Sequence, residues 1–205
     1  MVQNTTLNER MTPLLDALQG TDKATVRRAV EGLVALAAEE PDVGRMLDVR
    51  FRISPLWTIA YTLGQIARPH APCLEVLVRG LGSGDQDIRW ATQLLLADLG
   101  ASYPEVMLRL KTLVHEGSST QRRMAVYCLR DIGAAGVASL LLGSIEDPEP
   151  LVRVAAVTSL TKVSEVDSEE LVALRKAAAE DADVRVRNAA AFALKSLADD
   201  RMRLP

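Results

Sequence analysis

The sequence predicts an all-α fold, a solenoid built from about six two-helix repeats. Three observations indicate this fold: the composition, a pattern that recurs along the whole chain, and the small side chains within that pattern. Of the 205 residues, 58 are Ala or Leu, which favour helix, and only 3% are aromatic. A β-sandwich or barrel would need more Val, Ile, Thr and aromatic residues. The apolar fraction of 48% is too high for a disordered chain.

The recurring pattern starts at a residue called the anchor, which is apolar in five of the six repeats, and positions within a repeat are counted from it. Arg commonly follows at +1, Ala at +3 or +4, and apolar residues at +8 and +11. At 3.6 residues per turn, the anchor, +4, +8 and +11 share one helix face. Successive anchors are 29 to 34 residues apart. The six anchors are Val26, Pro55, Ile88, Gln121, Val152 and Val186.

The pattern forms the second helix of each repeat, and a less regular helix precedes it. The first helices are predicted at Asn8–Gln19, Asp42–Val49, Pro72–Leu81, Pro104–His115, Ala135–Ile145 and Ser168–Ala179. Polar residues that can cap the second helices are Asp22, Ser54, Asp85, Ser118, Asp147 and Asp181. The repeats therefore span approximately residues 8–38, 41–67, 71–100, 103–133, 134–164 and 167–198. We expect them to form a single domain over residues 1–205.

A two-helix unit of this size cannot bury its apolar face alone, whereas stacked units can. Ala at +3 and +4 would let neighbouring helices approach closely. The pattern V-R-x-A-A-x-x-x-L-x-x-[IL]-G is similar to HEAT repeats, particularly the short bacterial type of phycobilin lyase subunits. The resemblance implies a right-handed α-α superhelix whose second helices line the concave surface. It implies little about function, because that family is defined mostly by its scaffold.

Arginine recurs at +1, beside the core face and toward a neighbouring repeat. The column consists of Arg27, Arg89, Arg122, Arg153 and Arg187, and Leu56 interrupts it in the second repeat. The favoured interpretation is structural: each Arg would pair with aspartates of inter-helix turns, for example Asp85, Asp147 and Asp181. The alternative is a phosphate or nucleic-acid site. The excess of acidic residues, 27 against 24 basic, argues against it.

Aromatic residues gather at +2 and +6, on the face opposite the predicted core. Exposed apolar clusters of this kind usually mark binding sites, and Trp, Tyr and Arg are enriched among interface hot spots. The small residues Gly64 and Ala97 would leave a groove beside the two tryptophans. The predicted partner-binding residues are Trp57, Tyr61, Trp90, Leu94, Arg123, Tyr127, Arg130 and Phe192. The alternative is that these rings pack between neighbouring second helices and belong to the core.

The sequence holds no convincing pattern for catalysis or metal binding. His70 and Cys73 are three residues apart, but no second pair completes a zinc site, and His115-Glu116 is the sole His-Glu pair. No phosphate-binding glycine loop or nucleophile elbow is present. We therefore expect no catalytic residues, no metal and no cofactor. Cys73 and Cys128 are expected to be small buried apolar residues.

The leading functional hypothesis is a non-catalytic scaffold that binds a protein partner on its concave second-helix surface. One alternative, suggested by the resemblance, is a bilin-lyase-like subunit that handles a tetrapyrrole, a small-molecule ligand, or its acceptor protein. Another is a helical-repeat DNA glycosylase, against which the net charge of −3 argues. The sequence contains no signal-peptide pattern and no apolar run of membrane-spanning length. We expect a cytoplasmic bacterial protein without membrane contact.

Overall fold

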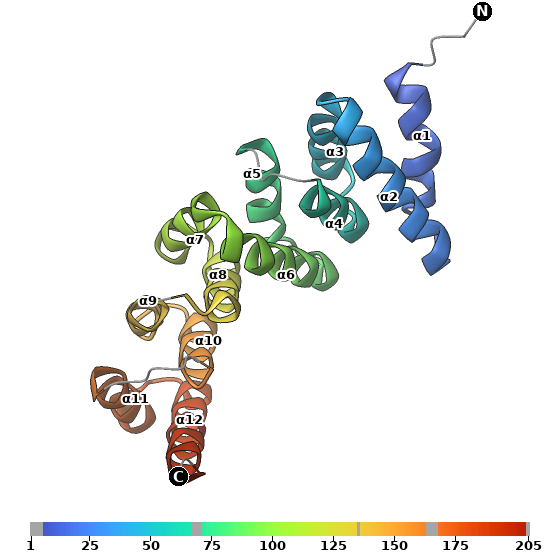
Figure 1. Ribbon diagram of the computed structural model, residues 1–205. Coiled ribbons are helices and arrows are strands. Elements are labelled where there is room, and N and C mark those ends of the chain that lie inside the picture. The colour runs from blue at the N-terminus through green and yellow to red at the C-terminus, as the bar shows by residue number, and fades with distance from the viewer. Residues whose placement is uncertain (1–5, 67–70, 135, 163–167, 204–205) are drawn as a thin grey trace, which may run out of the picture. The chain divides into compact units, whose positions relative to one another are not determined.

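The computed structural model describes residues 6–66, 71–134, 136–162 and 168–203, and their side chains except at 71–73, 168 and 199–203. Within these ranges the chain forms twelve helices and no strand (Figure 1). The helices are α1 (Leu7–Ala17), α2 (Lys23–Glu39), α3 (Asp42–Ile53), α4 (Trp57–Gln65), α5 (Ala71–Gly80), α6 (Gln86–Ser102), α7 (Pro104–Glu116), α8 (Ser119–Ile132), α9 (Val137–Ser144), α10 (Pro150–Leu160), α11 (Ser168–Glu180) and α12 (Val184–Arg203). The predicted fold class, an α solenoid of about six two-helix repeats, is confirmed.

The chain divides into two compact units, residues 1–95 (unit 1) and residues 96–205 (unit 2). In unit 1, α2 packs against α1, α3 and α4, and α3 and α4 both pack against α5. In unit 2, α8, α10 and α12 pack in one row, and α7, α9 and α11 form a second layer beside them (Figure 1). The single domain over residues 1–205 stays a prediction.

Small side chains fill the interior where neighbouring second helices meet. In α10, the anchor Val152 and the residues Ala155, Ala156 and Leu160 are fully buried. Val157, at +5, is also fully buried, because α10 lies between α8 and α12 and is covered on both sides. Cys128 of α8 is fully buried, as the sequence predicts. This burial of the pattern positions holds the stack together.

Three of the predicted helix caps are wrong. Asp22 and Ser118 do cap α2 and α8, through side-chain oxygens that accept from Thr25 N–H and Gln121 N–H. Ser54 instead ends α3, and α4 begins three residues later, after Leu56. Asp147 and Asp181 lie two or more residues ahead of α10 and α12. Their carboxylates instead accept hydrogen bonds from Arg122 and Arg153, the column arginines of the preceding repeats.

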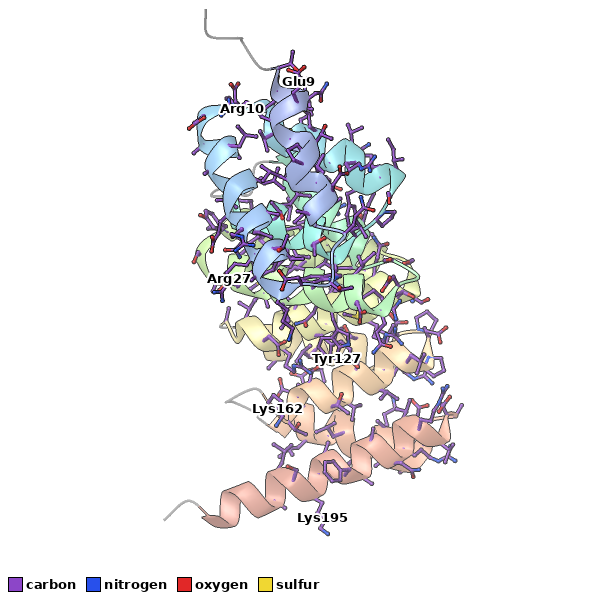
Figure 2. All side chains as sticks on the ribbon, turned by 90° about the vertical axis from the view of Figure 1, so that its right-hand side faces the viewer. Glu9, Arg10, Arg27, Tyr127, Lys162 and Lys195 are labelled. Atoms are coloured by element: carbon purple, nitrogen blue, oxygen red, sulfur yellow. The ribbon has the colours of Figure 1, made fainter. Side chains whose placement is uncertain are left out.

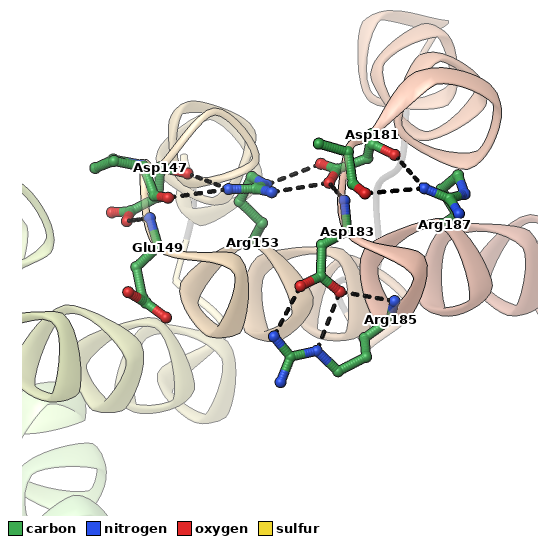
Figure 3. Close-up of polar contacts among 9 residues, drawn as sticks. Asp147, Glu149, Arg153, Asp181, Asp183, Arg185 and Arg187 are labelled. Atoms are coloured by element: carbon green, nitrogen blue, oxygen red, sulfur yellow. Dashed lines mark hydrogen bonds and ion pairs between the residues drawn. The ribbon is translucent and has the colours of Figure 1, made fainter.

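Arg122 and Arg153 link successive turns of unit 2. The guanidinium of Arg122 donates two hydrogen bonds to the Asp147 carboxylate, at 2.7 and 2.8 Å, and a third to the Gly117 carbonyl at 2.9 Å. Arg153 donates two to Asp181, both at 2.8 Å, and one to the Asp147 carbonyl at 2.8 Å (Figure 3). Each guanidinium thus joins the turn of its own repeat to the turn of the next one.

Two other arginines of the column, Arg187 and Arg89, bind a backbone carbonyl of their own turn. Arg187, in the last helix, donates to the carbonyl of Asp181 in its own turn at 2.6 Å (Figure 3). Arg89 likewise donates to the Ser83 carbonyl at 2.7 Å. Asp85, an expected arginine partner, accepts instead from the N–H groups of Asp87 and Ile88 at the start of α6. A bond to the carbonyl of its own turn is therefore the shared feature of four column arginines.

The carboxylates of Asp147 and Asp181, which pair with arginines of the column, stay ionised. The hydrogen bonds from Arg153 hold the pKa of Asp181 below its ordinary value. Burial by itself would raise the pKa of Asp147, but the hydrogen bonds from Arg122 and the Glu149 N–H outweigh it, and the pKa is lowered. Asp183, bound by Arg185, has its pKa lowered to about 2. These shifts mean that ionised aspartates stabilise the folded state.

Replacing Arg153 with Ala should lower the free energy of unfolding by about 2–4 kcal/mol, because it leaves a nearly buried carboxylate and a carbonyl unpaired. Urea denaturation followed by far-UV circular dichroism measures the change. The matched control is Arg185→Ala, since Arg185 is 57% exposed and pairs with Asp183. That variant should leave the urea midpoint nearly unchanged, because exposed ion pairs add little to stability. Equal effects of the two substitutions would contradict a structural role for the Arg153–Asp181 contact.

The protein should lose stability as the pH falls below the ordinary aspartate pKa of 3.8. Because the folded-state pKa values of Asp147 and Asp181 are lowered, their contribution is fully present above that pH. It disappears as the pH falls through the lowered values. Urea midpoints measured from neutral pH downward should show this decline. The Arg153→Ala variant should show a shallower decline, and an unchanged slope would argue against the assignment.

Candidate functional site

The two aromatic residues of α4 lie together on its exposed side. Trp57 and Tyr61 are one helical turn apart, with ring centroids 6.4 Å apart and planes inclined at 59°. Their side of α4 is open to solvent, and the residues are 47% and 41% exposed. On the opposite side, Ile59 is buried, and the buried Thr58 donates its hydroxyl proton to the Leu18 carbonyl at 3.2 Å. That bond fixes α4 against the end of α1 and so positions both rings.

Trp90 and Leu94 form the corresponding pair on α6. They are also one turn apart and are 45% and 59% exposed. Together, Trp57, Tyr61, Trp90 and Leu94 make up what we call the aromatic face of unit 1. Each of the four is 41–59% exposed, whereas the core residue Ile59 of α4 is 1% exposed.

The groove expected at Gly64 is not there. The side chain of Leu95 fills the space beside Gly64, and a Cβ added at that glycine would lie 2.5 Å from Leu95 Cδ2. Ala97 is half-buried. The small residue at +9 therefore serves the close approach of α4 and α6, because a larger side chain would clash, and it opens no space for a ligand.

A groove of about 730 Å³ lies instead between α2 and α4. Trp57, Tyr61 and Gln65 form its α4 side. The remaining lining residues come from α2 and the turn before it: Gly20, Thr21, Lys23, Val26, Arg27, Val30, Glu31 and Val34. Sequence reasoning missed this groove, because it assigned α2 to structure alone. The turn Ser54-Pro55-Leu56, which lacks an aspartate to pair with Arg27, was the signal that could have revealed it.

Arg27 departs from the rest of the arginine column. It is exposed near the N-terminal end of α2 (Figure 2) and makes no hydrogen bond or ion pair with the part of the chain that the structure describes. The turn that precedes α4 explains this difference. It consists of Ser54, Pro55 and Leu56, and so offers no carboxylate where unit 2 offers Asp147 or Asp181. A free guanidinium therefore lines the groove.

The predicted partner-binding residues of unit 2 range from half-buried to fully exposed. Tyr127 of α8 (Figure 2) is half-buried, and the Arg130 guanidinium lies 5.0 Å from its ring centroid. Arg130 also binds the Asp131 carboxylate at 2.6 and 3.0 Å, which balances its charge locally. Arg123 is half-buried. Phe192 of α12 is 71% exposed, so its ring is free to contact a partner.

The described residues contain no group of three or more His, Cys, Asp or Glu residues that could hold a metal ion. His70 and the side chain of Cys73 lie outside them, and His115 and Glu116 are both exposed. Burial raises the pKa of the Cys128 thiol, which keeps that sulfur in its less reactive protonated form. Within the described ranges, no helix has the length and apolar character to cross a membrane.

One family model matches part of the chain. Residues 106–195 match the family model for HEAT repeats. No curated protein matches the chain. The more specific resemblance to phycobilin lyase repeats stays a prediction.

Several designed proteins are similar to the chain in structure. One is a designed armadillo repeat protein in complex with the peptide (KR)4, at 17% identity, 90% of this chain, 98% of that chain and a TM-score of 0.44. Another is a computationally designed armadillo repeat protein for modular peptide recognition, at 18% identity, 90% and 98% coverage and a TM-score of 0.46. A third is an engineered protein, at 18% identity, 92% and 96% coverage and a TM-score of 0.43. We draw nothing about function from these likenesses.

Replacing both Trp57 and Trp90 with Ala should leave the helix content unchanged and alter the free energy of unfolding by no more than about 1 kcal/mol, because both rings are half open to solvent. Ile59→Ala is the matched control in α4, and it should cost about 2–5 kcal/mol because Ile59 is buried. Urea denaturation measures both. A loss in the double variant as large as that in Ile59→Ala would show that the rings act as core.

Proposed function

We propose, from the premise that residues 106–195 of this chain are HEAT repeats, that the protein is a non-catalytic scaffold which binds a protein partner. The repeat fold suggests a protein-binding scaffold in general. The finer part of the proposal is the surface. Partner contact takes place on the side of the second helices that carries the aromatic face, the side that the repeat resemblance predicts to be concave.

The single observation that carries this proposal is the exposure of the aromatic face. Two tryptophans, a tyrosine and a leucine, each 41–59% exposed, stand on two helices that approach each other closely at Gly64 and Leu95. Aromatic side chains bury large areas when covered, and at interfaces they are the residues whose truncation costs most. Elsewhere in the chain, the one phenylalanine of α3, Phe51, is buried. The exposed rings therefore do not reflect a general inability of this fold to bury aromatic residues.

The charged residues of unit 2 add a second contact region to the proposal. The Tyr127 ring, with Arg130 above it, presents a stacked apolar and cationic surface, and Phe192 adds an exposed ring on α12. Because Asp131 already neutralises Arg130, we assign that arginine a stacking role more than an electrostatic one. This region supports binding without requiring a charged partner.

The tagged full-length chain should capture a partner from a lysate of the organism that encodes it, and the Trp57→Ala/Trp90→Ala variant should lose that capture. Removing two anchoring rings is expected to weaken binding by about 2–4 kcal/mol for each hot-spot residue. Affinity purification followed by quantitative mass spectrometry measures the ratio of wild type to variant. The enrichment that depends on the two tryptophans identifies the partner.

The control variant is Leu108→Ala/Val172→Ala. Leu108 and Val172 are 68% and 62% exposed on α7 and α11, outside the aromatic face. Their loss removes exposed apolar surface of unit 2 without touching the proposed site, so capture should persist. The proposal fails if both double variants capture the same proteins as the wild type.

A further inference from the structure

The groove between α2 and α4 combines an apolar wall with an open cation. Val26, Val30 and Val34 follow one another at single-turn spacing along α2, and Trp57 and Tyr61 face them from α4. Arg27 and Lys23 lie in the same lining. A volume of about 730 Å³ is within the range of pockets that hold a few residues of a bound chain. The groove therefore suits a short segment with apolar side chains and a negative charge.

The arginine column of this same protein shows which group Arg27 would accept. At the equivalent position, Arg122 and Arg153 each hold an aspartate carboxylate from the following turn by two hydrogen bonds of 2.7–2.8 Å. Paired hydrogen bonds of this kind are strong and match the planar shape of the carboxylate. The turn before α4 supplies no such carboxylate, so the Arg27 donors are open to a group from another molecule.

The local charge balance also favours an anion. Lys23 and Arg27 face a single carboxylate of the lining, Glu31, and no ion pair joins any of the three to described residues. The carboxylate of Asp22, at the start of α2, is already engaged by the Thr25 N–H and hydroxyl. Phosphate groups of nucleic acid would require a wider basic surface than these two cations provide.

We propose that the groove between α2 and α4 binds an acidic peptide segment of the protein partner. An Asp or Glu carboxylate of the segment takes the hydrogen bonds of Arg27, in the place of the aspartate that the next turn supplies in unit 2. An apolar side chain beside it lies against Trp57 and Tyr61. This inference rests on the proposed scaffold function, and it specifies the chemistry of the partner.

The test uses two terminally blocked tripeptides, acetyl-Leu-Asp-Leu-amide and acetyl-Leu-Asn-Leu-amide, titrated into the full isotope-labelled chain. The indole N–H signal of Trp57, assigned with a Trp57→Phe variant, reports occupancy of the groove by NMR. We expect the Asp peptide to bind about tenfold more tightly than the Asn peptide, because a hydrogen-bonded pair of charged groups stabilises a complex by about that factor. Equal affinities, or no binding of either peptide, would overturn the proposal.

Variants at neighbouring arginines separate a specific pair from a general charge effect. Arg27→Gln should remove the preference for Asp and leave the fold intact, because Arg27 makes no hydrogen bond or ion pair with the described residues. Arg28→Gln makes the same change of charge one residue away. Arg28 is exposed outside the lining and donates to the Thr25 hydroxyl, so the preference should remain. An equal loss in both variants would overturn the proposal.

Two further measurements distinguish this inference from its competitors. Inorganic phosphate that binds more tightly than the Asp peptide would make a phosphate group the ligand and overturn the peptide assignment. Partner capture by Arg27→Gln distinguishes the inference from the scaffold function. If capture requires the two tryptophans and is unchanged in Arg27→Gln, the scaffold function stands and the acidic-segment proposal falls. Reduced capture in Arg27→Gln, with normal capture in Arg28→Gln, supports both.

Discussion

Burial of apolar helix faces between neighbouring repeats is the interaction on which the rest of this structure depends. A pair of helices of this length covers only part of its own apolar surface, and the next pair covers the remainder. In unit 2, α10 lies between α8 and α12 with Val152, Ala155 and Leu160 fully buried. Such close packing favours small side chains. It also explains why most of the few aromatic residues stand on the outer side of the second helices.

Apolar burial has no direction of its own, so the alignment of one repeat with the next needs directional contacts. Arg122 and Arg153 supply them in unit 2, since each holds a carbonyl of its own turn and the carboxylate of the following turn. In unit 1 the second repeat replaces this device with the Thr58 hydroxyl, which binds the Leu18 carbonyl. Within the described part of the chain, Arg27 is left without a hydrogen bond or ion pair. One residue type is thus a structural link in unit 2 and an open donor in unit 1.

The candidate site follows from the same substitution. Because the turn before α4 contains Ser54, Pro55 and Leu56, α4 starts late, and Trp57 stands at its first turn beside α2. The groove is lined by Arg27, for which this turn offers no aspartate, and by Trp57 at the start of α4. A local loss of a structural contact has therefore produced the apolar and cationic surface to which we assign binding.

The fold class, the approximate number of helix pairs and the buried side of each second helix could be predicted from the sequence, because helical periodicity is a local property. Tyr61 and Leu94 were assigned to the outer side on this basis, and both are exposed.

The sequence left undecided whether a turn aspartate caps its own helix or binds another repeat. In the structure, Asp147 and Asp181 each accept from the arginine of the previous repeat and also from an N–H of their own turn, that of Glu149 or Asp183. The sequence also left open whether there is a groove beside Gly64, and only the position of the Leu95 side chain showed that this space is filled. Tertiary structure likewise decided that Arg27 is open, since its pairing depends on a turn some thirty residues further along the chain.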